Sequence, residues 1–239
     1  MIKTLIREVL TKLKIDLTKN LKYDRLTIDI MKLVLNKNSN CIDVGCHKGE
    51  MLDLMLKYAP EGRHYAFEPI PFLYNNLKNK FSEKAEIYPY ALSDKKGQTT
   101  FNYVKNAPAY SGIKKRHYDI KNPDIEKINV ELHKLDDLIA QDTKIDLIKI
   151  DVEGAELGVL KGATKTISKN KPCVIFEFGL GASDYYGTTP EDIYKVLVDD
   201  CGLNIYKLHD WIKGKEPMSL EGLSKAYNQE GEYYFIAYK

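Results

Sequence analysis

A glycine-containing turn is the first feature of the sequence with clear chemical potential. The stretch from Cys41 to Glu50, CIDVGCHKGE, has the pattern of a strand, a tight turn and a helix. Gly45 can adopt a positive φ and has no Cβ, so a ligand can approach the backbone there. Gly49 precedes a helix whose first amides are donors without partners in the helix. The turn therefore predicts a bound, nucleotide-like ligand.

The identity of that ligand depends on the residues between the glycines. A dinucleotide-binding turn has glycine at its first, third and sixth positions, and here these positions hold Gly45, His47 and Glu50. The Glu50 carboxylate would repel a pyrophosphate. This favours S-adenosyl-L-methionine, which has a sulfonium cation, an amino acid group and a ribose but no phosphate. An NAD-dependent oxidoreductase is the alternative.

The ends of two later strands carry groups suited to a ribose and an adenine. Glu68 lies 23 residues after Gly45, at a predicted strand end where a carboxylate can accept hydrogen bonds from both ribose hydroxyls. A helix-capping or exposed acid before Pro69 is the alternative. The backbone and apolar groups of residues 90–94 can frame an adenine ring, and the same region can form a β-turn.

The strongest signal is the stretch from Leu147 to Glu156, LIKIDVEGAE. Lys149, Asp151 and Glu153 occupy alternate positions, which places them on one side of the chain while it stays extended. Buried charges are costly without partners, so we predict a paired network of these residues at the edge of a cleft. A purely structural cluster of ion pairs is the alternative.

Short apolar runs alternate along the chain with longer amphipathic runs, which is typical of parallel strands joined by helices. Strands are predicted at 41–44, 64–68, 86–92, 99–104, 130–132, 145–151, 173–178, 204–208 and 233–238. Helices are predicted at 23–35, 50–58, 71–81, 135–139, 154–168 and 189–200. The strand at 99–104 is expected to return beside that at 86–92 as a hairpin. The expected fold is α/β, with a mainly parallel seven-stranded sheet, flanking helices and an antiparallel terminal hairpin.

Taken together, these segments resemble the FkbM family of methyltransferases. The resemblance covers about residues 40–178 and depends on the order and spacing of IDVG at 42–45 with Gly49, FEP at 67–69, ALSD at 91–94, LDDL at 135–138 and KIDVEGAE at 149–156. It implies a Rossmann-like class I O-methyltransferase that uses S-adenosyl-L-methionine. Its typical acceptor is a hydroxyl of a sugar, a surface glycan or a natural product. The candidate cofactor-binding residues are Asp43, Gly45, His47, Gly49, Glu68, Ala91, Leu92, Ser93 and Asp151.

The protein's part in such a reaction is to align the acceptor oxygen and to remove its proton. Asp151 is the first candidate for this work, with Glu153 and Lys149 in support. His133 is an alternative catalytic residue because an imidazole titrates near neutrality. Asp151, Glu153 and Glu177 could also gather a divalent cation, but we predict a reaction without a metal.

Composition restricts the setting and the partners of the protein. The net charge of +2 gives no electrostatic case for nucleic acid, so a nucleic-acid methyltransferase is only the runner-up. The four cysteines match no metal-binding spacing and favour the cytoplasm. No run of residues approaches the roughly 20 apolar residues that span a bilayer. The expected partner is a small-molecule or saccharide acceptor.

We divide the chain into N-terminal helices at 1–36 and a methyltransferase domain at 37–239, within one globular unit. Residues 2–13 have the spacing of an amphipathic helix, which we expect to pack on the domain or on a second copy. Weak association with a membrane surface is the alternative. The oligomeric state is open, a homodimer included. A non-catalytic protein on a degenerate methyltransferase fold is the remaining rival.

Overall fold

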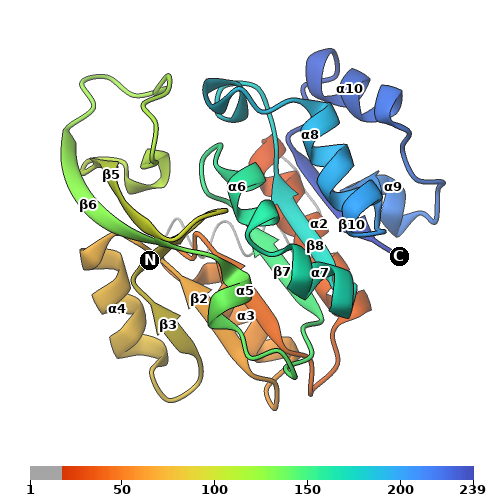
Figure 1. Ribbon diagram of the computed structural model, residues 1–239, viewed down its shortest axis with the longest axis horizontal. Coiled ribbons are helices and arrows are strands. Elements are labelled where there is room, and N and C mark those ends of the chain that lie inside the picture. The colour runs from red at the N-terminus through yellow and green to blue at the C-terminus, as the bar shows by residue number, and fades with distance from the viewer. Residues whose placement is uncertain (1–17) are drawn as a thin grey trace.

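The computed structural model describes residues 18–239, so the helix predicted at 2–13 lies outside the described residues. Figure 1 shows a central sheet with helices on both faces and a smaller sheet beside it. Within residues 18–239 the central sheet has seven strands in the order β3-β2-β1-β7-β8-β10-β9. The strands are β1 (Cys41–Val44), β2 (His64–Phe67), β3 (Glu86–Tyr88), β7 (Leu147–Ile150), β8 (Cys173–Glu177), β9 (Asn204–Lys207) and β10 (Tyr234–Tyr238).

Strand direction confirms the expected fold class. The pairs that join β3, β2, β1, β7 and β8 are parallel. β10 runs antiparallel to both of its neighbours, β8 and β9. This is the mainly parallel sheet with an antiparallel terminal pair that the alternation of apolar and amphipathic runs predicts.

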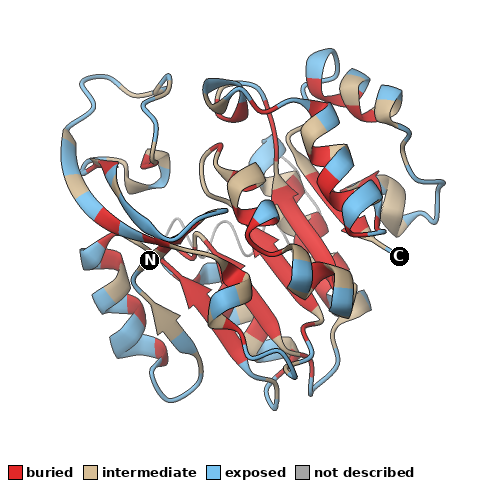
Figure 2. Cartoon of the chain, viewed as in Figure 1, coloured by how far each residue is buried: buried red, intermediate tan, exposed pale blue. Residues whose placement is uncertain are grey.

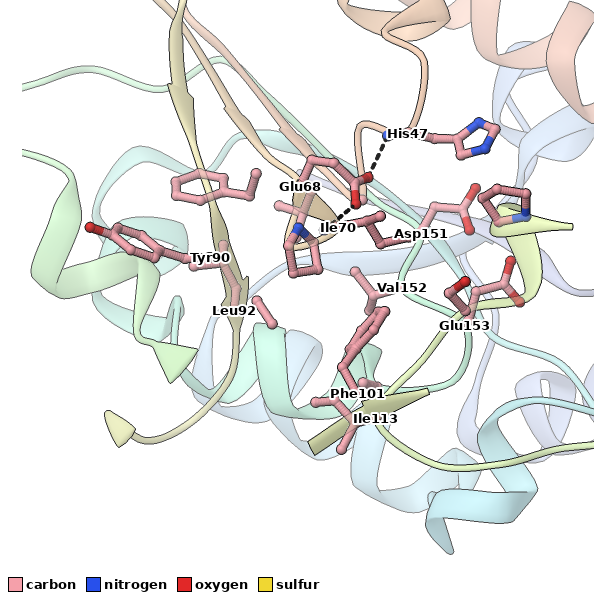
Figure 3. Close-up of a pocket in the computed structure, with 18 of the residues that line it drawn as sticks. His47, Glu68, Ile70, Tyr90, Leu92, Phe101, Ile113, Asp151, Val152 and Glu153 are labelled. Carbon is pink, nitrogen blue, oxygen red and sulfur yellow. Dashed lines mark hydrogen bonds between the residues drawn. The ribbon is translucent and has the colours of Figure 1, made fainter. Parts of the chain in front are cut away.

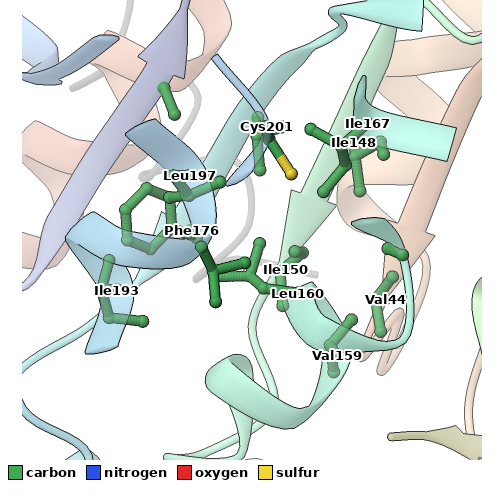
Figure 4. Packing of buried hydrophobic residues seen from close by; sticks show 14 of the residues in the cluster. Val44, Ile148, Ile150, Val159, Leu160, Ile167, Phe176, Ile193, Leu197 and Cys201 are labelled. Carbon is green, nitrogen blue, oxygen red and sulfur yellow. The ribbon is translucent and has the colours of Figure 1, made fainter. Parts of the chain in front are cut away.

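The two faces of the central sheet bury different side chains, because successive residues of a strand point to opposite faces. On one face the strands pack against α5 (Leu135–Leu138), α6 (Glu156–Lys161), α7 (Thr164–Asn170), α8 (Pro190–Tyr194), the π-helical η3 (Lys195–Asp200) and α10 (Leu220–Asn228). Figure 4 shows Ile148, Ile150 and Phe176 of this layer near Leu160 and Leu197. Figure 2 shows that the central strands β1, β2, β7 and β8 form the most continuously buried part of the molecule.

The opposite face carries α2 (Lys19–Val34), α3 (Glu50–Tyr58), α4 (Pro71–Phe81) and α9 (Leu208–Ile212). α2 buries Tyr23, Leu26, Ile30 and Met31 against this layer. The Thr18 hydroxyl accepts a hydrogen bond from the Leu21 amide, so the helix begins before the predicted residue 23. None of the helices described within residues 18–239 combines the length and the hydropathy that a membrane span requires.

The prediction of one continuous strand at 86–92 was wrong. Pro89 separates β3 from β4 (Tyr90–Leu92), because proline has no amide hydrogen to continue a strand ladder. β4 pairs with β6 (Ile125–His133) in a second sheet of order β4-β6-β5. The predicted hairpin was also wrong, since β5 (Gly97–Val104) pairs antiparallel with β6 and not with β4.

Other differences from prediction concern the ends and continuity of elements. The helices predicted at 50–58 and 71–81 are confirmed as α3 and α4. The helix predicted at 154–168 is divided into α6 and α7. The strand predicted at 130–132 is part of the nine-residue β6. α9 and α10 were not predicted, although Ser219 caps α10 through its side chain.

Candidate functional site

A cleft opens at the carboxyl ends of the parallel strands, the edge at which open α/β sheets bind ligands. Neighbouring strands β1 and β7 are followed by helices on opposite faces, α3 and α6. The cleft holds about 770 Å³ of empty space, counted to its open mouth. Its lining comes from the ends of β1, β2, β4 and β7 and from the loop at 108–113. The geometry is that of a ligand site at a topological switch point.

The turn after β1 is held against two neighbouring segments. The Gly45 and Cys46 amides both donate to the Phe67 carbonyl, at 3.0 and 3.1 Å. Gly45 has a φ of +79°, and a Cβ there would lie 1.8 Å from the carbonyl oxygen of Asp151. Any larger residue would therefore push β1 and the loop after β7 apart. Gly45 lines the cleft, as the sequence predicts for a ligand-binding turn.

Gly49 has a different surrounding from Gly45. It caps α3 with a φ of +78°, and a Cβ there would lie 2.5 Å from the ring of Phe81 in α4. The absent side chain thus lets α3 and α4 pack closely. Gly49 is not among the described residues that line the cleft.

Glu68 directly follows β2 and lines the cleft, and two backbone amides fix its side chain. Its side chain is buried, its Oε2 accepts from the His47 amide at 2.8 Å, and its Oε1 accepts from the Ile70 amide at 2.9 Å (Figure 3). Burial raises the pKa of Glu68 to about 7, and the two amide hydrogen bonds oppose that rise. Each carboxylate oxygen has a second lone pair, so Glu68 can accept two further hydrogen bonds from a ligand.

The wall beside Glu68 is apolar. Ala91 and Leu92 of β4 line it together with Ile70, Phe101 and Val152 (Figure 3). A flat aromatic ring could lie between such walls. Ser93 does not belong to this lining within the described residues; its carbonyl oxygen faces α6, 2.0 Å from where a Cβ at Gly162 would lie.

His133 is also away from the cleft. It ends β6, its ring lies 4.1 Å from that of Tyr90 between centroids, and its Nε2 lies 3.1 Å from a carboxylate oxygen of Glu131. Tyr90 lines the cleft, whereas His133 is not part of the described lining.

At the other end of the cleft, Asp151 is at the centre of a polar network. The buried Lys149 donates to its Oδ2 at 3.0 Å, and the Tyr234 hydroxyl donates to the same oxygen at 2.5 Å. Burial would raise the pKa of Asp151, but the charge of Lys149 and these hydrogen bonds hold it below its usual value. The neighbouring Asp43 on β1 is buried beside Lys149; its pKa is raised by burial, which that cation opposes.

The acidic residues come together through a turn. The prediction that Lys149, Asp151 and Glu153 share one side of an extended chain was wrong, because β7 ends at Ile150 and Glu153 has a φ of +59°. The turn still brings carboxylate oxygens of Asp151, Glu153 and Glu177 within 4.8 Å of one another. Of the predicted charge pairs, that between Lys149 and Asp151 is present, with Nζ 3.0 Å from Oδ2. Arg116, from the loop before β6, forms an ion pair with Glu153.

Glu177, at the end of β8, differs chemically from Asp151. Burial raises its pKa well above the usual range, and the nearby charges of Asp151 and Glu156 act in the same direction. A cluster of three such carboxyl groups resembles a divalent-cation site. Here the cations of Lys149 and Arg116 already lie against it.

A second cavity begins where the cleft ends. It holds about 780 Å³, counted to its mouth, and shares Ala109, Asp151 and Glu153 with the cleft. Its remaining described lining comes from α2, α3 and the ends of β7, β8 and β10: Asn20, Tyr23, Asp24, Thr27, Met51, Lys149, Glu177, Tyr233 and Tyr234. The sequence pointed to Lys149 and Glu177 in this lining. It gave no signal for Asn20, Tyr23, Tyr233 or Tyr234, because these residues belong to segments that match no motif.

Comparison with known proteins agrees with this geometry. Residues 43–205 match the Methyltransferase FkbM domain. The 2-O-methyltransferase NoeI of Sinorhizobium fredii is 26% identical over 64% of this chain and 68% of its own length. The methyltransferase sdnD of Sordaria araneosa is 29% identical over 54% of this chain, which spans 61% of that relative.

A solved structure shares the fold. The FkbM methyltransferase of Methylobacillus flagellatus superposes with a TM-score of 0.54 at 16% identity. The match covers 85% of this chain and 44% of that one.

Proposed function

The chain belongs to the FkbM methyltransferase family, and we propose that it transfers a methyl group from S-adenosyl-L-methionine to a hydroxyl of a saccharide, either free or within a glycan or natural product. The observation that carries the proposal is the order of groups along the cleft. Apolar walls at Leu92 lead to a double hydrogen-bond acceptor at Glu68 and then to carboxylates at Asp151 and Glu153 (Figure 3). The relative named a 2-O-methyltransferase supports oxygen as the accepting atom.

The residues of the cleft fit the methyl donor. Glu68 would accept the ribose hydroxyls, and Ala91 and Leu92 would enclose the adenine. The turn at Gly45 and His47 would hold the amino acid end; the buried Nε2 of His47 has no hydrogen-bond partner among the described residues. When bound, the cofactor supplies an electrophilic methyl group. Asp43 and Gly49 would support the turn on the side away from the cofactor.

Proton removal is the chemistry that this chain must supply. Asp151 has a lowered pKa, so it is a weak base but remains an ionised hydrogen-bond acceptor that can orient an acceptor hydroxyl. Glu177 has a raised pKa, which makes its carboxylate the stronger base. We therefore assign orientation to Asp151 and proton removal to Glu177. Lys149 and Glu153 would position Asp151 and the loop, and we assign no step to His133.

Methyl-labelled S-adenosyl-L-methionine tests the proposal directly. The protein is incubated with the labelled donor and a panel of saccharides, and label in the saccharide is measured by mass spectrometry. We expect transfer that S-adenosyl-L-homocysteine inhibits, and calorimetric binding of the donor without any saccharide. Absence of donor binding would overturn the proposal, and a thermal shift with NAD alone would support the oxidoreductase in its place.

A further inference from the structure

The turn after β7 supplies much of the wall that the two cavities share. Asp151, Val152, Glu153 and Ala155 all line the cleft, and Asp151 and Glu153 also line the second cavity. Figure 3 shows Asp151, Val152 and Glu153 at neighbouring points of this wall. The position of one short turn therefore determines where an apolar side chain and two carboxyl groups face a ligand.

The backbone of this turn has a conformation that needs support. Glu153 has a φ of +59°, and Gly154 follows with a φ of +103°. A non-glycine residue keeps a positive φ only where its surroundings require it. A Cβ at Gly154 would lie 2.5 Å from the Ala182 carbonyl oxygen and 2.8 Å from the Tyr186 ring. These close contacts fix the turn on one side, and its amide groups still require acceptors.

Glu156, at the start of α6, supplies an acceptor for two of these amides. Its side chain is buried, and its Oε1 accepts from the Val152 amide at 3.0 Å and from the Gly154 amide at 3.2 Å. One carboxyl oxygen thus joins the residues on both sides of Glu153. The backbone groups of such a turn form a concave nest that suits an oxygen acceptor. Loss of this oxygen would leave two amides without it, so the turn would rearrange.

The charge of Glu156 depends on the groups that face it. Burial raises the pKa of Glu156 to about 7, the turn amides oppose that rise, and the charge of Asp151 adds to it. Glu177 faces Glu156 from the end of β8, and Tyr186 and Arg116 lie at the same cluster. A carboxyl group keeps an acceptor oxygen in both of its charge states. The turn therefore needs the reach of this side chain more than its charge.

We propose that Glu156 is a positioning residue, which holds the turn at 152–154 so that Val152 and Glu153 face the bound ligands. The inference rests on the proposed function, in which the donor would occupy the cleft (the cofactor half) and the acceptor the second cavity (the acceptor half). Glu156 is not among the described residues that line either cavity, so it acts through the backbone of the turn. An acid that only stabilises the start of α6 by its charge is the competing explanation.

Two substitutions separate reach from charge. Glu156→Gln keeps the length of the side chain and one acceptor oxygen, whereas Glu156→Asp keeps the charge and is shorter by one methylene. NMR follows hydrogen exchange of the Val152 and Gly154 amides, and calorimetry measures the Kd of S-adenosyl-L-methionine. We expect Glu156→Gln to exchange as slowly as the unchanged protein and to change the Kd by less than about threefold. Glu156→Asp should speed exchange of both amides and weaken donor binding, each by about tenfold or more.

Glu191→Asp is the control for a shortened acid at a helix start, because Glu191 is exposed in the first turn of α8. It should change neither the exchange of the two amides nor the donor's Kd. Urea denaturation of every variant distinguishes local loosening of the turn from global unfolding. Donor binding by Glu156→Asp equal to that of the unchanged protein, or equal impairment in Glu156→Gln and Glu156→Asp, would overturn the inference. If Glu156→Asp does not fold, Glu156→Gln decides alone: slow exchange of the two amides supports the inference, and fast exchange overturns it.

The two proposals fail in different ways. If the unchanged protein does not bind S-adenosyl-L-methionine, the proposed function is overturned, while amide exchange in the two variants still tests whether Glu156 holds the turn. Donor binding that is retained in Glu156→Asp and lost in Glu156→Gln would overturn this inference alone.

Discussion

The cofactor half and the acceptor half of the site are built in opposite ways. The cofactor half takes Gly45, Glu68 and Leu92 from the ends of β1, β2 and β4, and each belongs to a short local motif. The acceptor half joins Asn20 to Tyr233, which are 213 positions apart. Strand-end turns carry the donor-binding chemistry locally, whereas the shape of the acceptor cavity depends on contacts between distant segments. Asp151 and Glu153 line both halves, and Gly45 packs directly against the backbone of Asp151.

Gly45→Ala should disrupt the cofactor half and the acceptor half together, and it should have the largest effect of these variants. The new Cβ would meet the Asp151 carbonyl oxygen at 1.8 Å, at a φ of +79°. We expect a loss of about 3 kcal/mol or more in the free energy of unfolding, measured by urea denaturation, with loss of both donor and saccharide binding by calorimetry.

Gly187→Ala is the matched control for that variant. Gly187 has a φ of +71°, and a Cβ there would have nothing within 4 Å, so only the backbone strain of about 1–2 kcal/mol should appear. Equal losses in the two variants would show that the close approach of β1 to the loop after β7 contributes little.

Glu177→Gln should separate the halves. Removal of a general base lowers kcat by about 10²–10⁴-fold, while the Kd of S-adenosyl-L-methionine should be unchanged. Because the pKa of Glu177 is raised, activity of the unchanged protein should increase with pH as this carboxyl ionises, and the variant should lose that dependence. Glu221→Gln, at an exposed position of α10, is the control. A parallel rise in the donor's Kd would argue against a base in the acceptor half.

Glu68→Gln should affect the cofactor half alone. Loss of charge-assisted hydrogen bonds to two hydroxyls should weaken donor binding by about 10–100-fold, with saccharide binding retained. Burial raises the pKa of Glu68 to about 7, so donor affinity should increase as pH rises through 7 and the carboxylate forms. Calorimetry from pH 6 to 8 measures this, and a pH-independent Kd in the unchanged protein would contradict it.

Ionisation of Glu68, which should strengthen donor binding, should lower the stability of the folded protein. A carboxyl whose pKa is raised in the folded state contributes stability that is complete below its ordinary value of 4.5 and is lost as pH rises through about 7. Glu68→Gln should therefore flatten the dependence of the unfolding free energy on pH across this interval. Glu83→Gln, at an exposed position after α4, should leave it unchanged.

Arg116→Ala should have the smallest effect and show to which half the loop before β6 belongs. Arg116 pairs with Glu153, lies 4.9 Å from the Tyr110 ring and reaches the Gly181 carbonyl at 3.4 Å. Its loss should raise the KM of the acceptor by about three- to tenfold, since a partly buried ion pair contributes about 1 kcal/mol. The adjacent, exposed Lys115→Ala should change nothing. An increase confined to the donor's KM would assign the loop to the cofactor half.

Sequence reasoning succeeded where a local rule determines the structure. β1 and α3 follow from an apolar run, a glycine turn and an amphipathic run, and Glu68 follows from its place at a strand end. Pro89 made a break in the strand predicted at 86–92 foreseeable. The partner of β4 was not foreseeable, because β6 is distant from β4 in the sequence. Asn20 and Tyr233 carry no local signal at all, so their meeting emerges only from the packing of α2 beside β10.

That meeting has a consequence for the order in which activity arises during synthesis. Contacts between distant segments form late, because the whole intervening chain must first be available. The turn at Gly45, Glu68 and the loop after β7 have all been translated before β10 begins at Tyr234. We therefore expect a nascent chain to form the turn at Gly45 and Glu68 first and to fix Asp151 only when Tyr234 of β10 is in place, so that methylation starts after β10 has packed beside α2.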